Sequence, residues 1–239
     1  MVYSTTLETW HTARYREFES LRLRKNFKPT EIITPAMETK SDSNFFYSKI
    51  AKFFDAVQVL SGYKLAVRYF IDLVPFERRQ NIKVLDAGCG TGLFSFALLR
   101  RFPNASIKAF DLNGDMMQRM IDTAHKKGLD KKIDFLIGDV TKPLPFNPGE
   151  FDLIITGGVL EYVDPPEAVK NLTTYLKRGG YFLNSPVQEG LSGQIVGKLY
   201  KFKPHSRSAN IRAFTDNNFA LQGTRSFPVI KEVHLFKKI

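Results

Sequence analysis

Short apolar runs alternate with helical patterns along most of this chain. The short runs predict buried strands at 84–86, 106–110, 132–137, 151–156 and 181–183. The apolar positions of 93–99 predict a helix directly after the first strand. An order of strand, helix and strand is typical of an α/β protein built on a mainly parallel sheet.

The first third of the chain has a different pattern. Residues 1–40 are polar and charged, and only a short stretch has rough helical spacing. Apolar positions from 44 to 76 predict two helices that break near Ser61-Gly62. We therefore predict an N-terminal helical appendage over 1–76 and a sheet domain over 77–239.

Three glycines at alternate positions follow the first strand, in the sequence Asp86-Ala87-Gly88-Cys89-Gly90-Thr91-Gly92. Glycine tolerates positive φ and lets the backbone approach a ligand closely, and the next helix presents unpaired N–H groups to the turn. A nucleotide-like cofactor binds at such a turn in a parallel sheet. A dinucleotide fingerprint would need glycine where Leu93 stands, and the Gly-Lys-Ser/Thr ending of a phosphate-binding P-loop is absent.

The form D-x-G-x-G-x-G resembles the first motif of the class I S-adenosylmethionine-dependent methyltransferases, and the resemblance continues in order from about Phe45 to Ile239. The second strand leads into Asp111, a carboxylate suited to accept two hydrogen bonds from a ribose diol. The third leads into Asp139 and Val140, which match the family's contacts to the adenine amino group and ring. Residues 177–180 resemble the family's L-K-P-G-G turn, with Arg178 in place of proline.

This resemblance is greatest to the methyltransferase type 11, or ubiquinone/menaquinone methyltransferase-like, group. It implies a Rossmann-like fold: a seven-stranded, mostly parallel sheet with helices on both faces, an N-terminal helical lid and an antiparallel C-terminal hairpin formed by 219–227 and 231–236. It also implies S-adenosyl-L-methionine as the cofactor and S-adenosyl-L-homocysteine as the product. The positions that match the family's cofactor-binding residues are Tyr47, Asp86, Gly88, Cys89, Gly90, Asp111, Leu112, Met116, Asp139, Val140 and Gly157.

Simpler roles compete for some of these positions. Ordinary helix packing explains Tyr47 equally well, and Asp139 is also suited to stabilise the turn before Thr141. Asp86 is placed to cap the helix after the glycines, a role compatible with reaching the methionine amino group of the cofactor.

Composition narrows the class of protein. The 239 residues are 43% hydrophobic, enough for one full core with an appendage. The single cysteine, Cys89, excludes an internal disulfide and is typical of a reducing compartment. No apolar run reaches the ~20 residues that span a bilayer, and the first ten residues lack the layout of a secretory signal. We therefore expect a cytoplasmic enzyme.

The chain has a net charge of +11, and its final 39 residues carry eight bases against two acids. Between Gly190 and Thr215 there is no acid, while the bases of 198–212 are interleaved with apolar residues. An anionic small molecule, an anionic membrane surface that supplies a lipid-like substrate, and RNA would each fit such a segment, as would a solvated surface with no partner. Nucleic acid is disfavoured, because no second binding module is present and 156–159 lacks the N/D/S-P-P-Y/F motif. We expect a small-molecule acceptor, with peripheral membrane contact as a second option.

Methyl transfer from a sulfonium is an in-line displacement, so the protein mainly positions the acceptor and excludes water. A base is needed only where the acceptor must lose a proton. The candidates are Glu161, Tyr162 and His205, although Glu161 also suits a helix start and His205 an exposed loop. The histidines lack metal-ligand spacing, so we predict no metal. The alternative functions are RNA or protein methylation on the same fold, and a non-catalytic S-adenosylmethionine-binding subunit.

Overall fold

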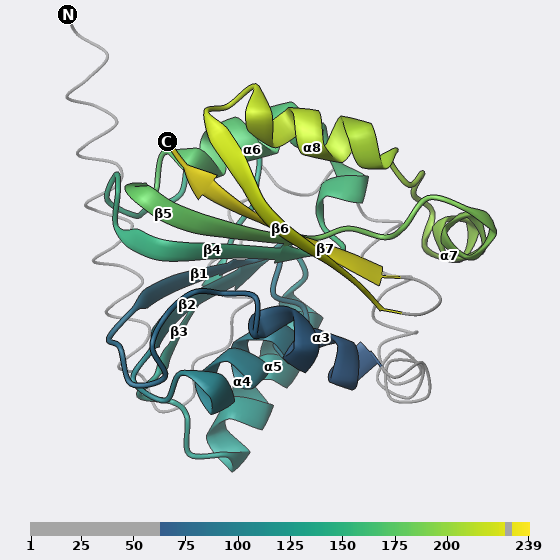
Figure 1. The fold of residues 1–239 in the computed structure, drawn as a ribbon. Coiled ribbons are helices and arrows are strands. Elements are labelled where there is room, and N and C mark those ends of the chain that lie inside the picture. The colour runs from purple at the N-terminus through teal and green to yellow at the C-terminus, as the bar shows by residue number, and fades with distance from the viewer. Residues whose placement is uncertain (1–62, 228–230) are drawn as a thin grey trace, which may run out of the picture.

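Seven strands form one sheet in the computed structural model, which describes residues 63–227 and 231–239 (Figure 1). The sheet order is β3-β2-β1-β4-β5-β7-β6. The strands are β1 (Lys83–Ala87), β2 (Ser106–Asp111), β3 (Ile133–Ile137), β4 (Phe151–Gly157), β5 (Leu176–Ser185), β6 (Phe219–Phe227) and β7 (Lys231–Lys238). Strands β1 to β5 run parallel, and β7 is antiparallel to both β5 and β6. The predicted Rossmann-like sheet and its antiparallel C-terminal hairpin are confirmed.

Helices cover both faces of the sheet, as Figure 1 shows. One face carries α3 (Tyr63–Ile71), α4 (Leu93–Arg101) and α5 (Gly114–Lys126). The other face carries α6 (Pro165–Thr173) and α8 (Arg207–Thr215), while α7 (Leu191–Tyr200) stands apart from the body of the domain. A short 3-10 helix, η3 (Leu160–Tyr162), follows β4. The predicted appendage before residue 63, with Tyr47, lies outside the described residues.

The strands are apolar on both sides because helices bury both faces of the sheet. In β1, Val84 packs toward α3, α4 and α5 while its neighbour Leu85 packs toward α6 and α8, and neither is exposed. In β5 the alternation continues with Phe182 and Leu183. This two-sided burial explains why the strands appear in the sequence as nearly continuous apolar runs.

The fifth strand begins earlier than the sequence predicts. Leu176 already pairs with Phe151, and the next pair joins Tyr181 to Leu153, so residues 177–180 form a bulge in the strand. Gly179 within it has a φ of +73°, a conformation that favours glycine. The glycine-rich turn is therefore present, but as an interruption of β5 rather than as the turn before it.

Aromatic side chains fix α8 on the sheet. The Phe214 ring stacks on Phe236 of β7 at a centroid distance of 4.1 Å, and it meets the edges of Phe182 and Phe219. Such ring pairs add to the free energy of burial. These contacts hold the end of α8 against β5, β6 and β7.

The parallel register gathers the carboxyl ends of five strands at one edge. Asp111 at the end of β2 is level with Ile137, and Gly157 at the end of β4 is level with Ser185. This is the edge at which ligands bind in open α/β sheets. The predicted cofactor-binding residues of the described part of the chain lie along it or next to it.

Candidate functional site

The glycine loop after β1 is attached to the end of β2. The N–H groups of Gly88 and Cys89 both donate to the carbonyl oxygen of Phe110, at 2.8 and 3.0 Å. Gly88 has a φ of +72°, and a Cβ atom there would lie 2.3 Å from Cγ2 of Val159. Any side chain at this position would therefore displace the segment after β4.

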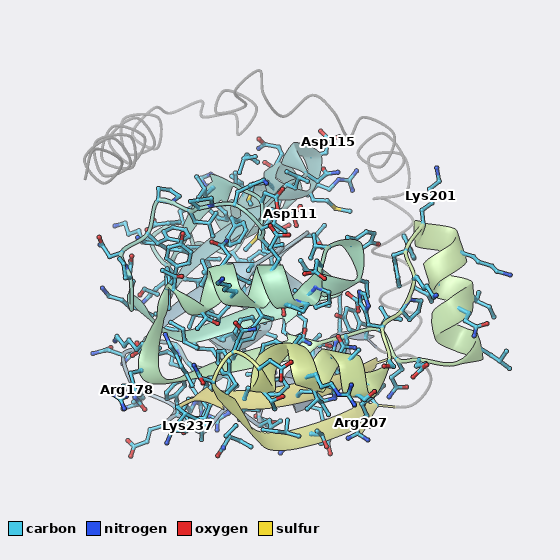
Figure 2. The ribbon with its side chains drawn as sticks, turned by 90° about the horizontal axis from the view of Figure 1, so that it is seen from above. Asp111, Asp115, Arg178, Lys201, Arg207 and Lys237 are labelled. Carbon is cyan, nitrogen blue, oxygen red and sulfur yellow. The ribbon has the colours of Figure 1, made fainter. Side chains whose placement is uncertain are left out.

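Gly90 sits at the open part of the loop. Its φ is +54°, and an added Cβ would meet no atom within 4 Å. Its N–H donates to Oδ2 of Asp111 at 2.8 Å, while Oδ1 of Asp111 accepts the N–H of Asn113, also at 2.8 Å. Asp111 thus joins the glycine loop to the start of α5, and it lies at the upper side of the domain in Figure 2.

Burial raises the pKa of Asp111 above its usual value of 3.8, against the hydrogen bonds from Asn113 and Gly90 that favour its ionised form. Each carboxylate oxygen has a second lone pair. Asp111 can therefore accept hydroxyl groups of a ligand without giving up its two backbone partners.

Asp86 is buried beneath the loop, with 2% of its surface exposed. Its Oδ2 accepts the hydroxyl of Ser95 in the first turn of α4 at 2.6 Å. Burial raises the pKa of Asp86 to about 6, and the Ser95 hydrogen bonds oppose this rise. The predicted contact with the start of the next helix is therefore present, and contact with a ligand stays a prediction.

Cys89 is the buried residue between the two loop glycines. Burial raises the pKa of its thiol well above 9.0, and the nearby Asp86 and Asp111 carboxyls add to the rise. A thiol that stays protonated is a poor nucleophile. Cys89 is suited to a close-packed turn rather than to covalent chemistry.

Two apolar residues follow Asp111 at the same edge. The Leu112 side chain is 37% exposed, whereas Met116 is 5% exposed in the first turn of α5. The N–H groups of Asp115 and Met116 donate to Oδ1 of Asn113, which caps the helix. Leu112 is therefore the apolar side chain that this segment offers to a ligand.

The predicted residues after β3 and β4 have structural partners of their own. Oδ1 of Asp139 accepts the N–H and the hydroxyl of Thr141, at 2.9 and 2.8 Å, so the turn role predicted for Asp139 is present. Val140 is buried on the α6 side of the sheet. A Cβ at Gly157 would lie 2.4 Å from Cε2 of Phe94, so β4 and α4 meet closely there.

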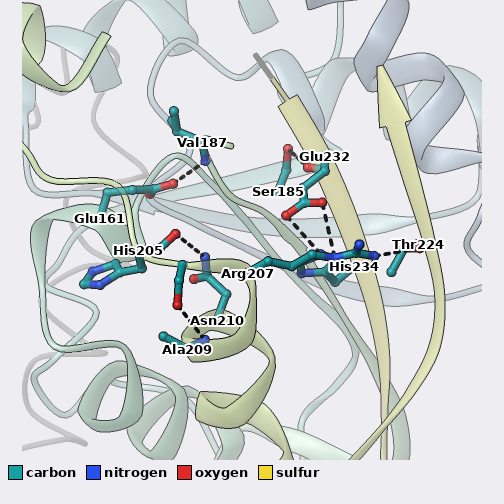
Figure 3. Close-up of polar contacts among 11 residues, drawn as sticks. Glu161, Ser185, Val187, His205, Arg207, Ala209, Asn210, Thr224, Glu232 and His234 are labelled. Atoms are coloured by element: carbon teal, nitrogen blue, oxygen red, sulfur yellow. Dashed lines mark hydrogen bonds and ion pairs between the residues drawn. The ribbon is translucent and has the colours of Figure 1, made fainter. Parts of the chain in front are cut away.

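Glu161 lies past the end of β4, in the short helix η3. It is 7% exposed; its Oε1 accepts the N–H of Val187, and its Oε2 is buried without a hydrogen-bond partner (Figure 3). A buried carboxylate oxygen without a partner is costly unless a ligand, water or ion satisfies it. Glu161 is thus suited to accept a proton or a hydrogen bond.

His205 and Tyr162 lie on the same side of the molecule as Glu161. Nε2 of His205 is buried without a hydrogen-bond partner, and the His205 carbonyl accepts Nδ2 of Asn210 at 3.4 Å (Figure 3). The Tyr162 ring packs edge-on against Phe202 at 5.1 Å. The contact joins η3 to the chain that leads to His205, and so connects the segments that hold all three candidates.

Three buried polar residues near this edge were not predicted to contact one another. Thr156, Asn184 and His234 are in register across β4, β5 and β7, all at most 1% exposed, and Oγ1 of Thr156 donates to Oδ1 of Asn184 at 2.9 Å. A polar residue inside each of three apolar runs is the signal that marks them. Ser95 and Val159 gave no such signal, because the sequence shows neither that Ser95 bonds Asp86 nor that Val159 packs against Gly88.

The described residues contain neither a cluster of metal-ligating side chains nor a membrane-spanning helix. Among 63–227 and 231–239, no three His, Cys, Asp or Glu side chains are grouped so as to hold a metal ion. No helix in the same part of the chain combines the length and apolar character needed to cross a membrane.

The edge has the features that a nucleoside-containing cofactor requires. Gly90 leaves open space beside the backbone, Asp111 offers carboxylate oxygens for hydroxyl groups, and Leu112 exposes an apolar side chain for a ring. The residues present therefore fit S-adenosylmethionine.

Comparison with known proteins agrees with this fit. A family model described as a methyltransferase domain matches residues 78–224. The malonyl-[acyl-carrier protein] O-methyltransferase 2 of Ilyobacter polytropus is 29% identical over 153 residues, which are 62% of this chain and 55% of that protein. The ubiquinone biosynthesis O-methyltransferase of Xylella fastidiosa is 33% identical over 124 residues, 49% of this chain and 48% of that protein.

A solved structure shares the fold at low identity. The geranyl diphosphate C-methyltransferase of Streptomyces coelicolor, solved with Mg²⁺, geranyl-S-thiolodiphosphate and S-adenosyl-L-homocysteine, has a TM-score of 0.64 and 14% identity. The match covers 73% of this chain and 76% of that one. This chain spans about half the length of the curated relatives named above.

Proposed function

This chain belongs to the methyltransferase-domain family, whose cofactor is S-adenosylmethionine, and on that premise we propose that it methylates a small organic acceptor. The observation that carries the proposal is the arrangement of Asp111, Gly90 and Glu161 at one edge of the sheet. Asp111 and Gly90 form an open, carboxylate-lined end at β1 and β2, and Glu161 holds an unpartnered carboxylate oxygen after β4.

The cofactor-binding residues are assigned by position and chemistry. Asp111 would accept the ribose hydroxyls, and the exposed Leu112 would contact the adenine with Met116 packed beneath it. Gly88, Cys89 and Gly90 would let the backbone approach the cofactor. Asp86 and Gly157 would lie toward the methionine end of the cofactor, and Asp139 and Val140 toward the adenine. When bound, the cofactor supplies a sulfonium that makes its methyl group electrophilic.

Glu161 is the residue best placed to receive a proton from the acceptor. Its Oε1 is held by the Val187 N–H, which fixes the carboxylate, and its free Oε2 is shielded from water. A positioned carboxylate contributes typically 10²–10⁴-fold when the acceptor must be deprotonated. Tyr162 and His205 are the other candidates for this role, on segments joined by the contact of Tyr162 with Phe202.

The acceptor is proposed to be hydrophobic or anionic. Support comes from the five exposed bases between Lys198 and Arg212, in a segment with no acids, because such a surface attracts anions. Names of similar proteins also support it: they refer to malonyl-[acyl-carrier protein], ubiquinone biosynthesis and geranyl diphosphate.

The acceptor class is tested by supplying methyl-labelled S-adenosylmethionine and the purified protein to an extract of cells that lack the gene. We expect label in the small-molecule fraction that an organic solvent removes. Label confined to RNA or to protein would contradict the proposed acceptor. Cofactor binding without transfer to any fraction would support a non-catalytic subunit instead.

The role of Glu161 is tested by Glu161→Gln. Glutamine retains an oxygen for the Val187 N–H but cannot take up a proton, so we expect kcat to fall by about 10²-fold or more with unchanged cofactor affinity. Glu167→Gln, an exposed acid of α6, is the matched control. A purely structural Glu161 would instead lower the melting temperature while kcat and its pH profile stay as in the wild type.

A further inference from the structure

Helix α7 packs two glycines inward and turns two large aliphatic residues outward. Gly193 and Gly197 are buried. A Cβ at Gly193 would lie 1.9 Å from the carbonyl oxygen of Gln188, and one at Gly197 would lie 2.6 Å from that of Phe202. Leu191 and Ile195, in contrast, are 81% and 68% exposed. A helix that only had to pack on its own domain would bury the aliphatic face.

The outward residues form one continuous surface. At about 100° per residue, Leu191, Ile195 and Lys198 fall within an arc of about 60° on the helix. All three are exposed, and the opposite side carries the buried Gly193 and Tyr200. The outward face therefore combines two aliphatic side chains with a lysine.

The segment around this face is strongly basic. Lys198, Lys201, Lys203, Arg207 and Arg212 are all exposed, and no acid occurs from Gly190 to Thr215. The nearest acids in sequence are Glu189, before the helix, and Asp216, after α8. Arg207 at the start of α8 is paired with Glu232 of β7 at 3.7 Å, so the lysines before it carry the basic character of this face. Figure 2 shows α7 standing away from the sheet, with Lys201 at one of its ends, so the body of the domain does not cover this face.

We propose that α7 and the chain up to Arg207 form an interfacial element that binds the surface of an anionic lipid membrane. Leu191 and Ile195 insert among the acyl chains near the headgroups, and Lys198, Lys201 and Lys203 contact the lipid phosphates. An exposed aliphatic face beside lysines is the arrangement by which helices lie in a membrane interface, and each base near an anionic leaflet adds to the attraction.

The size of the face favours lipid over a protein partner. A stable protein interface needs about 800 Å² on each side, and two aliphatic side chains on a ten-residue helix provide only a fraction of that. A bilayer needs no complementary shape, since its headgroups and acyl chains adapt to the side chains. Lipid also supplies both chemistries of the face, apolar and anionic, in one plane.

This surface is connected to the acceptor side of the site. Phe202, which follows α7, packs against Tyr162, the neighbour of Glu161. A lipid surface bound at α7 would thus lie next to the segment where a hydrophobic acceptor enters. Membrane binding does not depend on methyl transfer, and it can be measured without cofactor or acceptor.

The proposal is tested by co-sedimentation with vesicles of phosphatidylcholine, alone and mixed with phosphatidylserine in a two-to-one ratio. We expect the full chain to bind the mixed vesicles, and to bind pure phosphatidylcholine at least tenfold more weakly. Leu191→Gln with Ile195→Gln should weaken binding at least tenfold, and Lys198→Gln with Lys203→Gln should weaken it and reduce its salt dependence. Leu65→Gln, which alters a 61% exposed leucine on α3, is the matched control and should bind as the wild type.

Three results would overturn the proposal. One is failure of the wild type to bind the mixed vesicles, and another is unchanged binding by the Leu191 and Ile195 variant, which would leave a basic surface that does not insert. The third is self-association of the wild type in the absence of lipid that this variant abolishes, which would assign the face to a second copy of the chain. Equal melting temperatures of all variants establish that each is folded.

Discussion

At the residue scale, the site depends on carboxylates whose environments differ although they lie close together. Asp86 and Asp111 are both buried, and burial raises the pKa of each. Asp111 has two backbone N–H partners that favour its ionised form, whereas Asp86 has the Ser95 hydrogen bonds and a pKa of about 6. Asp86 is therefore the carboxylate whose charge changes in mildly acidic solution.

This raised pKa gives Asp86 a defined effect on stability. Because its folded pKa of about 6 lies above the ordinary 3.8, the folded state binds the proton more tightly than the unfolded state. The contribution of Asp86 is fully present below about pH 4 and is lost as the pH rises through about 6. A tenfold difference in proton affinity between the two states corresponds to about 1.4 kcal/mol, so the loss amounts to at most about 3 kcal/mol.

Asp86→Asn removes this titration. The free energy of unfolding of the wild type, measured by urea denaturation without cofactor, should fall relative to that of the variant between pH 4 and pH 7. Comparing the two proteins at each pH cancels the other titrating groups. A wild type that gains stability over the variant as the pH rises would show that Asp86 is stabilised as a carboxylate.

At the element scale, the glycine loop after β1 and the segment after β4 are packed as one unit. Gly88 leaves room for Val159, whose side chain would meet an added Cβ at 2.3 Å. The loop is also tied to β2 by the two hydrogen bonds to Phe110. The glycine loop and the segment after β4 are thus in van der Waals contact at Gly88 and Val159.

Gly88→Ala should therefore destabilise the domain and weaken cofactor binding, since overpacking costs about 1–3 kcal/mol. Adding Val159→Ala removes the two γ-methyl groups and should recover part of that loss, leaving the strain of the positive φ. A double-mutant cycle on the free energy of unfolding should give a coupling of about 1 kcal/mol or more. Additive effects within about 0.5 kcal/mol would mean that the two segments move independently.

The elements differ in how far the sequence predicts them. The central strands are evident because burial on both faces produces apolar runs, and Asp111 is evident because it closes such a run after a glycine loop. Helices α7 and α8 were not predicted. In α7 two glycines face inward while Leu191 and Ile195 are exposed, which departs from the usual pattern of a helix that buries its large apolar residues. In α8 the short pattern is dominated by Phe214, whose partners come from three distant strands.

At the scale of the whole molecule, the sheet order places β7 between β5 and β6, so the last strand of the chain is an inner strand. The sequence predicted the hairpin but carries no local signal for which of its strands pairs with β5. His234, one of four histidines in the sequence, is buried in that inner strand level with Asn184. Which strand pairs with β5 is set by how distant parts of the chain pack together, and not by a local sequence motif.

The sheet places the glycine loop and Asp111 together at the carboxyl ends of β1 and β2, the site assigned to the cofactor. The most direct test concerns this site. The measurement is calorimetric titration of S-adenosyl-L-homocysteine into the full chain, into Asp111→Ala and into Asp152→Ala. Asp152 is the control because it binds the Lys83 N–H and Lys177 at the opposite edge of the sheet.

We predict binding by the wild type and by Asp152→Ala, and at least tenfold weaker binding by Asp111→Ala, a loss of about 1.4 kcal/mol or more. Absence of binding to the wild type, or equal affinity for all three proteins, would contradict the assignment of the cofactor to the glycine loop and Asp111.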